Sequence, residues 1–354
     1  MSDFKDILQA AGPFATVLVD VSTETETGEH ERQLRVRECV DALQEQGAPE
    51  GVRDAVAQAL ADPTEGPSPR SRYVVVGADG SVLCDEVHAM RTQGQATWAP
   101  LPDLFPVLAA AADATSLVLV SVEHTGGSVT TYDSRTLDLT DVEQFDGEEQ
   151  YAQKVRSGAL AHRRMQQTSE DVWRDNAREL ADLALSQVRA GRRLVVVAGS
   201  PESRGEVVSA LESAAEVIEL DRAGESSTDG GEEALLTELQ TVAEQHLEER
   251  RQQLVATVQE RRGQGQAIAD DVPTVLDCLV RGQVETLLLD PDALREHDVD
   301  PGQHPGLPLP ALDGPVRTDL LLVAAAVSTD AAVRALPHDV DGPVAALLRW
   351  DQSA

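Results

Sequence analysis

The sequence predicts a mixed α/β (α+β) protein, and three observations support this fold class. Uninterrupted apolar runs such as RRLVVVAGS at residues 192–200 have the length and composition of buried strands. Segments with apolar residues at helical spacing alternate with these runs, which indicates an α/β arrangement. Glycine- and proline-rich stretches separate the elements. At 354 residues, the chain is long enough for roughly two or three hydrophobic cores.

The first segment, residues 1–113, is predicted to be an α/β domain. It contains a short helix, a strand, two further helices and a β-hairpin, which we expect at residues 2–11, 14–22, 28–49, 52–60 and 72–87. Leu34, Val36, Val40 and Leu43 stand near helical spacing in the long helix. The Ala-Asp-Gly turn at residues 78–80 tolerates a positive φ, as a hairpin requires.

The middle segment, residues 114–222, is predicted to contain a partly parallel sheet flanked by helices. Residues 115–134 read as two strands that turn at Thr125-Gly126-Gly127. A polar stretch follows, and then a helix, a strand, a helix and a strand, which we expect at residues 168–191, 192–200, 201–215 and 216–221. This alternation is typical of parallel strands joined by crossover helices.

The third segment, residues 223–354, is predicted to be a second α/β domain. A small polar linker at residues 223–233 leads into a long helix, and residues 267–292 read as a helix, a glycine turn and a strand. Within residues 316–337, the run LLLVAAAV at Leu320–Val327 predicts a buried strand followed by a helix. Residues 342–350 predict a terminal strand.

Charge and composition exclude several classes of protein. The chain holds 62 acidic and 29 basic residues, a formal charge of -33 that repels nucleic acid at long range. We therefore expect no DNA partner. A cationic leader and an apolar run of 18 residues are both missing from the sequence, so we expect a cytoplasmic protein without a membrane partner, and we expect a monomer.

Metal and cofactor sites are not predicted. Cys39, Cys84 and Cys278 are far apart, so we expect reduced core residues in place of a disulfide or a zinc site. The histidines form no HExxH pattern, and VVVAGSPESRGEVV at residues 195–208 lacks the lysine of a phosphate-binding loop.

One stretch stands apart from the acidic background. QYAQKVRSGALAHRRMQQTS, at residues 150–169, contains no Asp or Glu. It carries the cations Lys154, Arg156, Arg163 and Arg164, together with His162. The residues alone leave two interpretations open: a surface loop paired with the protein's own acids, or a loop that contacts RNA phosphates.

Three features of the sequence resemble the bacterial archaeo-eukaryotic-type release factors. Members of this family carry a strand hairpin followed by a loop of the form K-x-x-R-G-G-Q and a long helix, and here QKVRSGALAHRR lies between a hairpin and a helix. RRLVVVAGSPESRGEVVSAL resembles the next strand and helix, and GQVETLLLD at residues 282–290 resembles the opening of the third domain. The likeness covers roughly residue 115 to the C-terminus.

The resemblance implies a three-domain, release-factor-like architecture that binds the 70S ribosome at its A site. The first domain would face the decoding centre, the middle loop the peptidyl-transferase centre, and the third domain the stalk base or elongation factor Tu. Residues that would contact ribosomal RNA are Lys154, Arg156, Ser157, Gly158, Ala159, His162, Arg163 and Arg164.

The same resemblance implies a protein without hydrolytic activity. The family's Gly-Gly-Gln aligns with Ser157, Gly158 and Ala159, and an alanine cannot orient the attacking water. We therefore expect no catalytic residue. This state resembles the Balon-type hibernation factors, which occupy idle ribosomes and silence translation under stress.

Two alternatives stay open. The chain could be a peptidyl-tRNA or RNA hydrolase of the Vms-like branch that uses another side chain, for which His162 is the candidate. It could also be an acidic stress protein that binds only protein partners.

Overall fold

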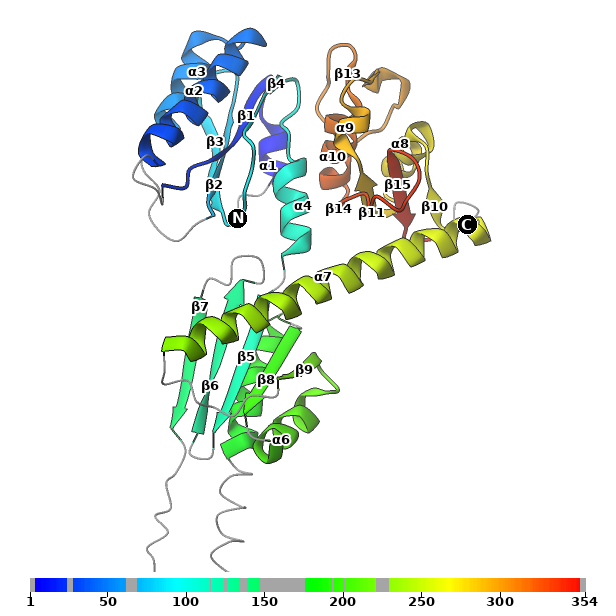
Figure 1. Cartoon of the computed structure of the whole chain (residues 1–354). Coiled ribbons are helices and arrows are strands. Elements are labelled where there is room, and N and C mark those ends of the chain that lie inside the picture. Colours follow the sequence, from blue (N-terminus) through cyan, green and yellow to red (C-terminus); the bar gives the residue numbers. More distant parts are fainter. Residues whose placement is uncertain are drawn as a thin grey trace, which may run out of the picture. The chain divides into compact units, whose positions relative to one another are not determined.

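The computed structural model describes residues 4–23, 28–61, 69–114, 116–123, 126–133, 139–146, 176–190, 192, 194–199, 201–220 and 229–350. Helices and strands are mixed along these residues, which confirms the α/β class (Figure 1). The chain forms two compact units. The first unit combines Met1–Asp113 with Leu247–Ala354, and the second is Ala114–His246. The division into domains 1–113, 114–222 and 223–354 stays a prediction.

The first unit contains an antiparallel four-stranded sheet in the order β3-β2-β1-β4. These strands are β1 (Phe14–Asp20), β2 (Ser71–Val76), β3 (Val82–His88) and β4 (Gln95–Ala99). Apolar residues occupy both faces of β1, so both faces of the sheet are covered. One face packs on α2 (Gly28–Glu45) and α3 (Glu50–Ala59), and the other on α1 (Phe4–Gln9) and α4 (Phe105–Asp113).

A second sheet in the same unit has the order β10-β15-β11-β14, in which β11 and β14 are parallel. Its strands are β10 (Ile268–Ala269), β11 (Val284–Leu289), β14 (Ala332–Ala335) and β15 (Val344–Leu348). The surrounding elements are α8 (Val272–Val280), α9 (Pro291–Leu294), η1 (Pro301–Gln303), α10 (Thr318–Ser328) and the pair β12 (Asp298–Val299) and β13 (Val316–Arg317). The last part of α7 (Asp229–Gln264) packs Val258 against Leu288 and Leu347.

The run Leu320–Val327 forms a helix, so the predicted order of strand then helix in residues 316–337 is wrong. The run lies in α10, and the strand β14 follows it. Every residue from Thr318 to Ala326 is buried, so the helix has no polar face and no helical period in its sequence. Leucine and alanine are strong helix formers, and a continuous apolar run alone cannot distinguish a buried helix from a buried strand.

The two sheets of the first unit share one hydrophobic core. Phe14 and Tyr73 from the first sheet belong to the same buried cluster as Leu287 from the second sheet and Leu321 from α10. An ion pair of 2.6 Å between Lys5 Nζ and Asp330 Oδ1 joins the same two segments. The first and third segments of the sequence are therefore packed together.

The second unit is a five-stranded sheet in the order β7-β6-β5-β8-β9. Its strands are β5 (Ser116–Glu123), β6 (Gly126–Asp133), β7 (Leu139–Asp146), β8 (Leu194–Gly199) and β9 (Glu216–Leu220). β5, β8 and β9 are parallel, whereas β6 and β7 are antiparallel additions. A helix described over residues 176–189 and α6 (Pro201–Leu211) cover one face, and the first part of α7 covers the other. The predicted partly parallel sheet flanked by helices is confirmed; β7 was not predicted.

Among the described residues, no helix combines the length and the apolar character that crossing a membrane requires.

Candidate nucleic-acid interface

The residues predicted to contact RNA lie outside the described part of the chain. They are Lys154, Arg156, Ser157, Gly158, Ala159, His162, Arg163 and Arg164. The structure does describe the strand that precedes this stretch, β7, and the helix of residues 176–189 that follows it. These two elements are the described parts of the chain that precede and follow the stretch in the sequence.

Strand β7 ends at the same end of the second unit's sheet as β5 and β8. Strand pairing sets Glu123 of β5 opposite Gly126, and Gly126 opposite Asp146 of β7. The parallel strand β8 ends at the same level, where Gly199 lies opposite Val122. We call this end of the sheet, where β5, β7 and β8 end, the loop end. It carries the end of β7 and the beginning of α6, and β7 is paired with β6 up to Asp146.

A close approach fixes the helix of residues 176–189 on the sheet. A Cβ placed on Gly127 would lie 2.2 Å from Ser121 O and 2.7 Å from Leu180 Cδ1, both too short for any real contact. Leu180 is fully buried in the core beneath this helix. Gly126 and Gly127 thus begin β6, which corrects their predicted place in the turn, and the missing side chain of Gly127 makes room for the helix.

A polar clamp joins the same helix to β7. The buried Gln187 donates from Nε2 to Glu143 Oε1 at 2.9 Å and lies 3.5 Å from Asp141 Oδ2. Its own Oε1 accepts a hydrogen bond from Arg192. A buried amide with these partners is satisfied, so the clamp holds the two elements that flank the cationic stretch in one arrangement.

A buried arginine elsewhere in the second unit binds the protein's own groups. Arg204, at the start of α6, is buried and donates from Nε to Glu219 Oε2 at 2.7 Å and from Nη1 to Leu220 O at 2.6 Å. It ties α6 to the end of β9. This guanidinium stabilises the sheet edge and does not face a ligand.

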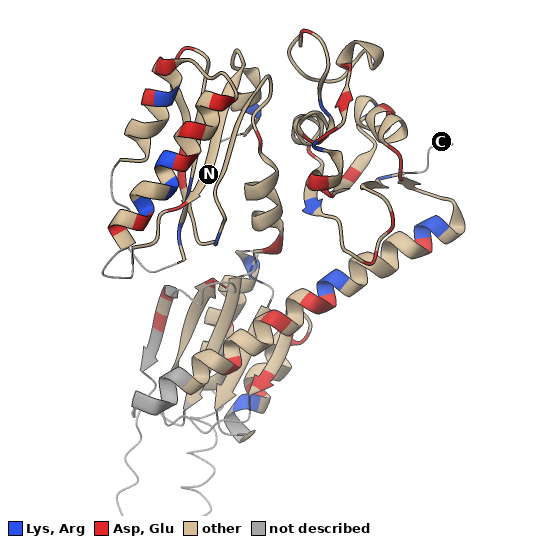
Figure 2. Cartoon of the chain, turned by 45° about the horizontal axis from the view of Figure 1, so that its top comes forward, with Lys and Arg blue, Asp and Glu red and all other residues tan. Residues whose placement is uncertain are grey.

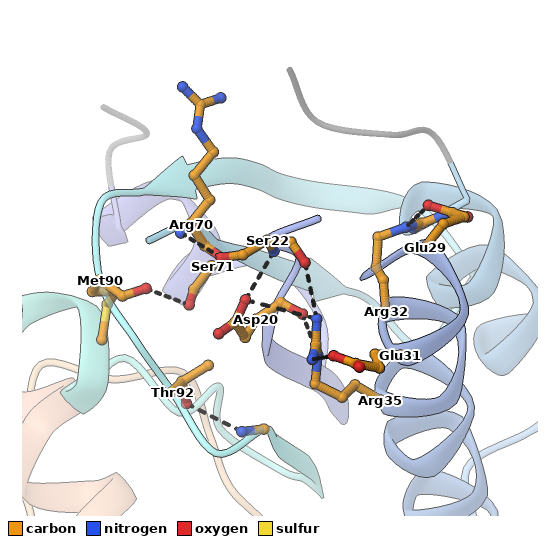
Figure 3. A network of polar contacts seen from close by, with 11 residues as sticks. Asp20, Ser22, Glu29, Glu31, Arg32, Arg35, Arg70, Ser71, Met90 and Thr92 are labelled. Carbon is orange, nitrogen blue, oxygen red and sulfur yellow. Dashed lines mark hydrogen bonds and ion pairs between the residues drawn. The ribbon is translucent and has the colours of Figure 1, made fainter. Parts of the chain in front are cut away.

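In a polar network of the first unit, arginines likewise donate to the protein's own backbone (Figure 3). Arg35 donates to the backbone oxygens of Asp20 at 2.9 Å and Ser22 at 3.1 Å, where β1 ends. Arg32 donates to Leu60 O at 2.7 Å, where α3 ends. Carbonyl groups at the end of a helix or strand lack a regular backbone partner, and a hydrogen bond from a charged donor to them is favourable. Arg35 and Arg32 therefore stabilise the chain where β1 and α3 end.

A buried carboxyl in the first unit has a raised pKa. Asp103, between β4 and α4, has its pKa raised to about 6 by burial and then by the nearby carboxylate of Asp319, while Arg317 and Arg295 oppose the rise. Both aspartates are buried, with exposed fractions of 8% and 2%. A buried carboxyl with a raised pKa is typical of acid–base sites, but the groups that shift the pKa of Asp103 all belong to the protein itself.

The remaining titratable candidates are structural. Cys39, Cys84 and Cys278 are buried free thiols, as predicted, and burial raises the pKa of Cys39 to about 11. Among the described residues, no group of three or more His, Cys, Asp or Glu side chains could hold a metal ion. His304 Nδ1 lies 3.4 Å from Asp277 Oδ1, and the backbone oxygen of His297 accepts from Thr318.

Comparison with known proteins matches residues 116–264 to the model of bacterial archaeo-eukaryotic release factor family 2. Uncharacterised proteins of Mycobacterium tuberculosis strains H37Rv and CDC 1551 are each 26% identical over 207 residues, which cover 58% of this chain and 54% of the relative. The chain thus spans about half the length of the curated relatives it matches.

The solved structures to which this chain is similar share less of its sequence. A model of ribosome-bound archaeal Pelota and ABCE1 is 12% identical, covering 99% of this chain and 95% of the other at a TM-score of 0.43. Archaeoglobus fulgidus Pelota is 13% identical, with 81% of each chain covered and a TM-score of 0.31. An archaeal translation termination factor is 14% identical, with 99% of each covered and a TM-score of 0.26. The family match over residues 116–264 confirms the predicted resemblance; the hibernation branch stays a prediction.

Proposed function

We propose that this chain binds the A site of idle 70S ribosomes and silences translation without hydrolysing peptidyl-tRNA, because its residues 116–264 match the model of bacterial archaeo-eukaryotic release factor family 2. The first segment then faces the decoding centre and the cationic stretch faces the peptidyl-transferase centre. The third segment is free to meet elongation factor Tu. The protein acts in the cytoplasm as a monomer.

The observation that carries the proposal is the chemistry of the family loop in this chain. Where the family has Gly-Gly-Gln, the sequence reads Ser157, Gly158 and Ala159. Water attack on the ester needs a side chain that positions the water, and a methyl group neither donates nor accepts a hydrogen bond. Hydrolysis is thereby lost, whereas the cations beside the motif are kept.

The charge distribution supports a local contact with ribosomal RNA. In a chain of formal charge -33, acidic positions are spread along helices such as α2 and α7 (Figure 2). The stretch 150–169 is free of acids and holds four fixed cations. Cations that contact phosphates need a firm base, and β7 and the helix of residues 176–189 supply one through Gly127 and the Gln187 clamp.

Co-sedimentation of the full chain with vacant 70S ribosomes at several salt concentrations tests the proposal. The test variant replaces Lys154, Arg156, Arg163 and Arg164 with alanine. A matched control makes the same charge change at four exposed arginines outside the stretch, namely Arg37, Arg91, Arg189 and Arg281.

Wild type and control should sediment with ribosomes, and the loop variant should not. Loss of four phosphate contacts should also make the slope of log affinity against log salt concentration less negative by about 3, using the coefficient for single-stranded nucleic acid. Equal binding by all three proteins, or binding by none, overturns the proposal.

Hydrolysis is tested separately with peptidyl-tRNA on 70S ribosomes. No peptide release is expected from wild type. Release that disappears in His162→Ala would overturn the non-hydrolytic part of the proposal in favour of an enzyme that uses this histidine.

A further inference from the structure

We propose that the side chain of Gln46 closes the free edge of the first sheet at β4 and keeps two copies of this chain from pairing through that strand. The carboxamide occupies backbone groups to which a neighbouring strand would bind. The inference goes beyond the proposed function and does not depend on it, because it rests on contacts within the first unit alone.

Two hydrogen bonds join Gln46 to the outer edge of β4. Its Nε2 donates to Ala96 O at 2.9 Å, and its Oε1 accepts from Trp98 N at 2.8 Å. A residue of a parallel strand beside Thr97 would make the same two bonds with its own N–H and C=O groups, because parallel pairing joins one residue to the two neighbours of the residue that it faces. The carboxamide therefore takes the place of one residue of a further strand.

The end of α2 fixes the backbone of Gln46. The next residue, Gly47, has a φ of +86°, which lies in the left-handed region. Its amide donates to Gln44 O at 3.0 Å, and the Ala48 amide donates to Leu43 O at 2.9 Å. This pair of bonds is the glycine-ended motif that closes many helices. Leu43 and Ala48 are buried, so the helix end is anchored and only the side-chain torsions of Gln46 stay free.

β4 lacks the other features that protect an edge strand. Its sequence, QATWA, contains no charged residue and no proline, and its five residues pair with β1 without a shift of register. A regular, uncharged edge of this kind is a template for pairing with another chain. Among the described strands, β4 stands at the end of the sheet order, so Gln46 is the group that covers its outer edge.

The opposite edge of the sheet, β3, is protected in a different way. The register of its pairing with β2 shifts between Val75 and Val76, which is the irregularity of a bulge. The strand also contains Asp85 and Glu86. Bulges and charged side chains both oppose pairing of an edge strand with another chain. A covering side chain is therefore needed at β4 and not at β3.

The partner that Gln46 excludes is a second copy of the chain. Two β4 strands related by a twofold axis at Thr97 would set Ala96 of each copy opposite Trp98 of the other. Such residues of an antiparallel pair exchange both N–H···O bonds, and they would use Ala96 O and Trp98 N, the groups that Gln46 occupies. Because β4 carries no charge, the strands themselves offer no repulsion.

Analytical ultracentrifugation of the full chain over a range of protein concentrations tests the inference. The salt concentration is kept high enough to screen the repulsion between copies of formal charge -33. The test variant is Gln46→Ala. The matched control is Gln33→Ala, which removes an exposed glutamine of α2 whose Nε2 donates to a side chain, Glu29 Oε1, at 2.8 Å.

Wild type and Gln33→Ala should sediment as monomers, and Gln46→Ala should approach about twice that mass as its concentration rises. Adding Gln95→Lys to Gln46→Ala should restore the monomer, because a lysine on an exposed edge strand opposes pairing. The inference is overturned if Gln46→Ala stays monomeric, if wild type associates as strongly as Gln46→Ala, or if the double variant still associates.

A second measurement covers the case in which Gln46→Ala does not fold. Amide hydrogen exchange of wild type reports on the Trp98 N–H, which donates to Gln46 Oε1. This amide should exchange more slowly than the intrinsic rate of an unstructured peptide. Exchange at the intrinsic rate shows that the carboxamide does not cover the edge, and it overturns the inference without any variant.

Discussion

Replacing Gly127 with alanine should destabilise the second unit and displace the helix that follows the cationic stretch. The new Cβ would lie 2.2 Å from Ser121 O and 2.7 Å from Leu180 Cδ1. The first contact is with backbone of the paired strand β5, which cannot rotate away as a side-chain end can. Overpacking of this kind costs about 1–3 kcal/mol, and the backbone clash places Gly127→Ala near the upper end.

The assay is urea unfolding of the full chain, with hydrogen exchange of peptides from β5, β6 and residues 176–189 to locate the loss. The matched control is Gly205→Ala in α6, where an added Cβ meets nothing within 4 Å. That change should stabilise α6 by up to about 1 kcal/mol, because alanine is the better helix former. Equal stability of Gly127→Ala and Gly205→Ala would refute the close packing of this helix on β6.

Two further predictions concern the first unit. Asp271→Ala removes the cap of α8, in which the carboxylate accepts from Thr274 N at 3.0 Å, and should cost about 1 kcal/mol of unfolding free energy in urea. Arg261→Met removes donors to Ala267 O at 3.1 Å and Leu348 O at 3.0 Å and should cost about 1–2 kcal/mol by the same assay. An unchanged urea midpoint in either variant would show that its hydrogen bonds add nothing to stability.

The elements that sequence reasoning identified are those with a local signal. The apolar run of β8 predicted a strand covered on both faces, and helices do cover both faces of its sheet. Asp271 and Asp290 each accept backbone hydrogen bonds at the start of a helix, a position that aspartate favours. Such features depend on neighbours within a few residues, so a single sequence contains the information.

The elements that were missed or misassigned depend on distant partners. β7 reads LTDVEQFD, which lacks the apolar pattern of a buried strand, and among the described strands it is the first in the sheet order. α10 was taken for a strand because its burial on every side erases the helical period. In both cases the tertiary surroundings decide what the local sequence leaves ambiguous.

The candidate sites divide in the same way. The composition of the stretch 150–169 is visible in the sequence, and the contact with RNA phosphates that it suggests stays a prediction. The raised pKa of Asp103 could not be predicted, because its causes are burial and the carboxylate of Asp319, which is far away in the chain. The fold of the first unit buries Asp103, and no local motif announces this.

The cationic stretch still has two interpretations, and the stability of the loop variant separates them. In the described residues, arginines such as Arg35, Arg204 and Arg261 donate to backbone carbonyls or acids of the same chain. If the loop cations likewise paired with the protein's own 62 acids, their removal would lower the unfolding free energy, and ribosome binding would be lost only because the variant unfolds. If they contact only ribosomal phosphates, the loop variant should unfold at the wild-type urea concentration and fail only in co-sedimentation. Loss of both properties together would therefore favour the surface-loop interpretation, even though the binding result alone would resemble that of an RNA contact.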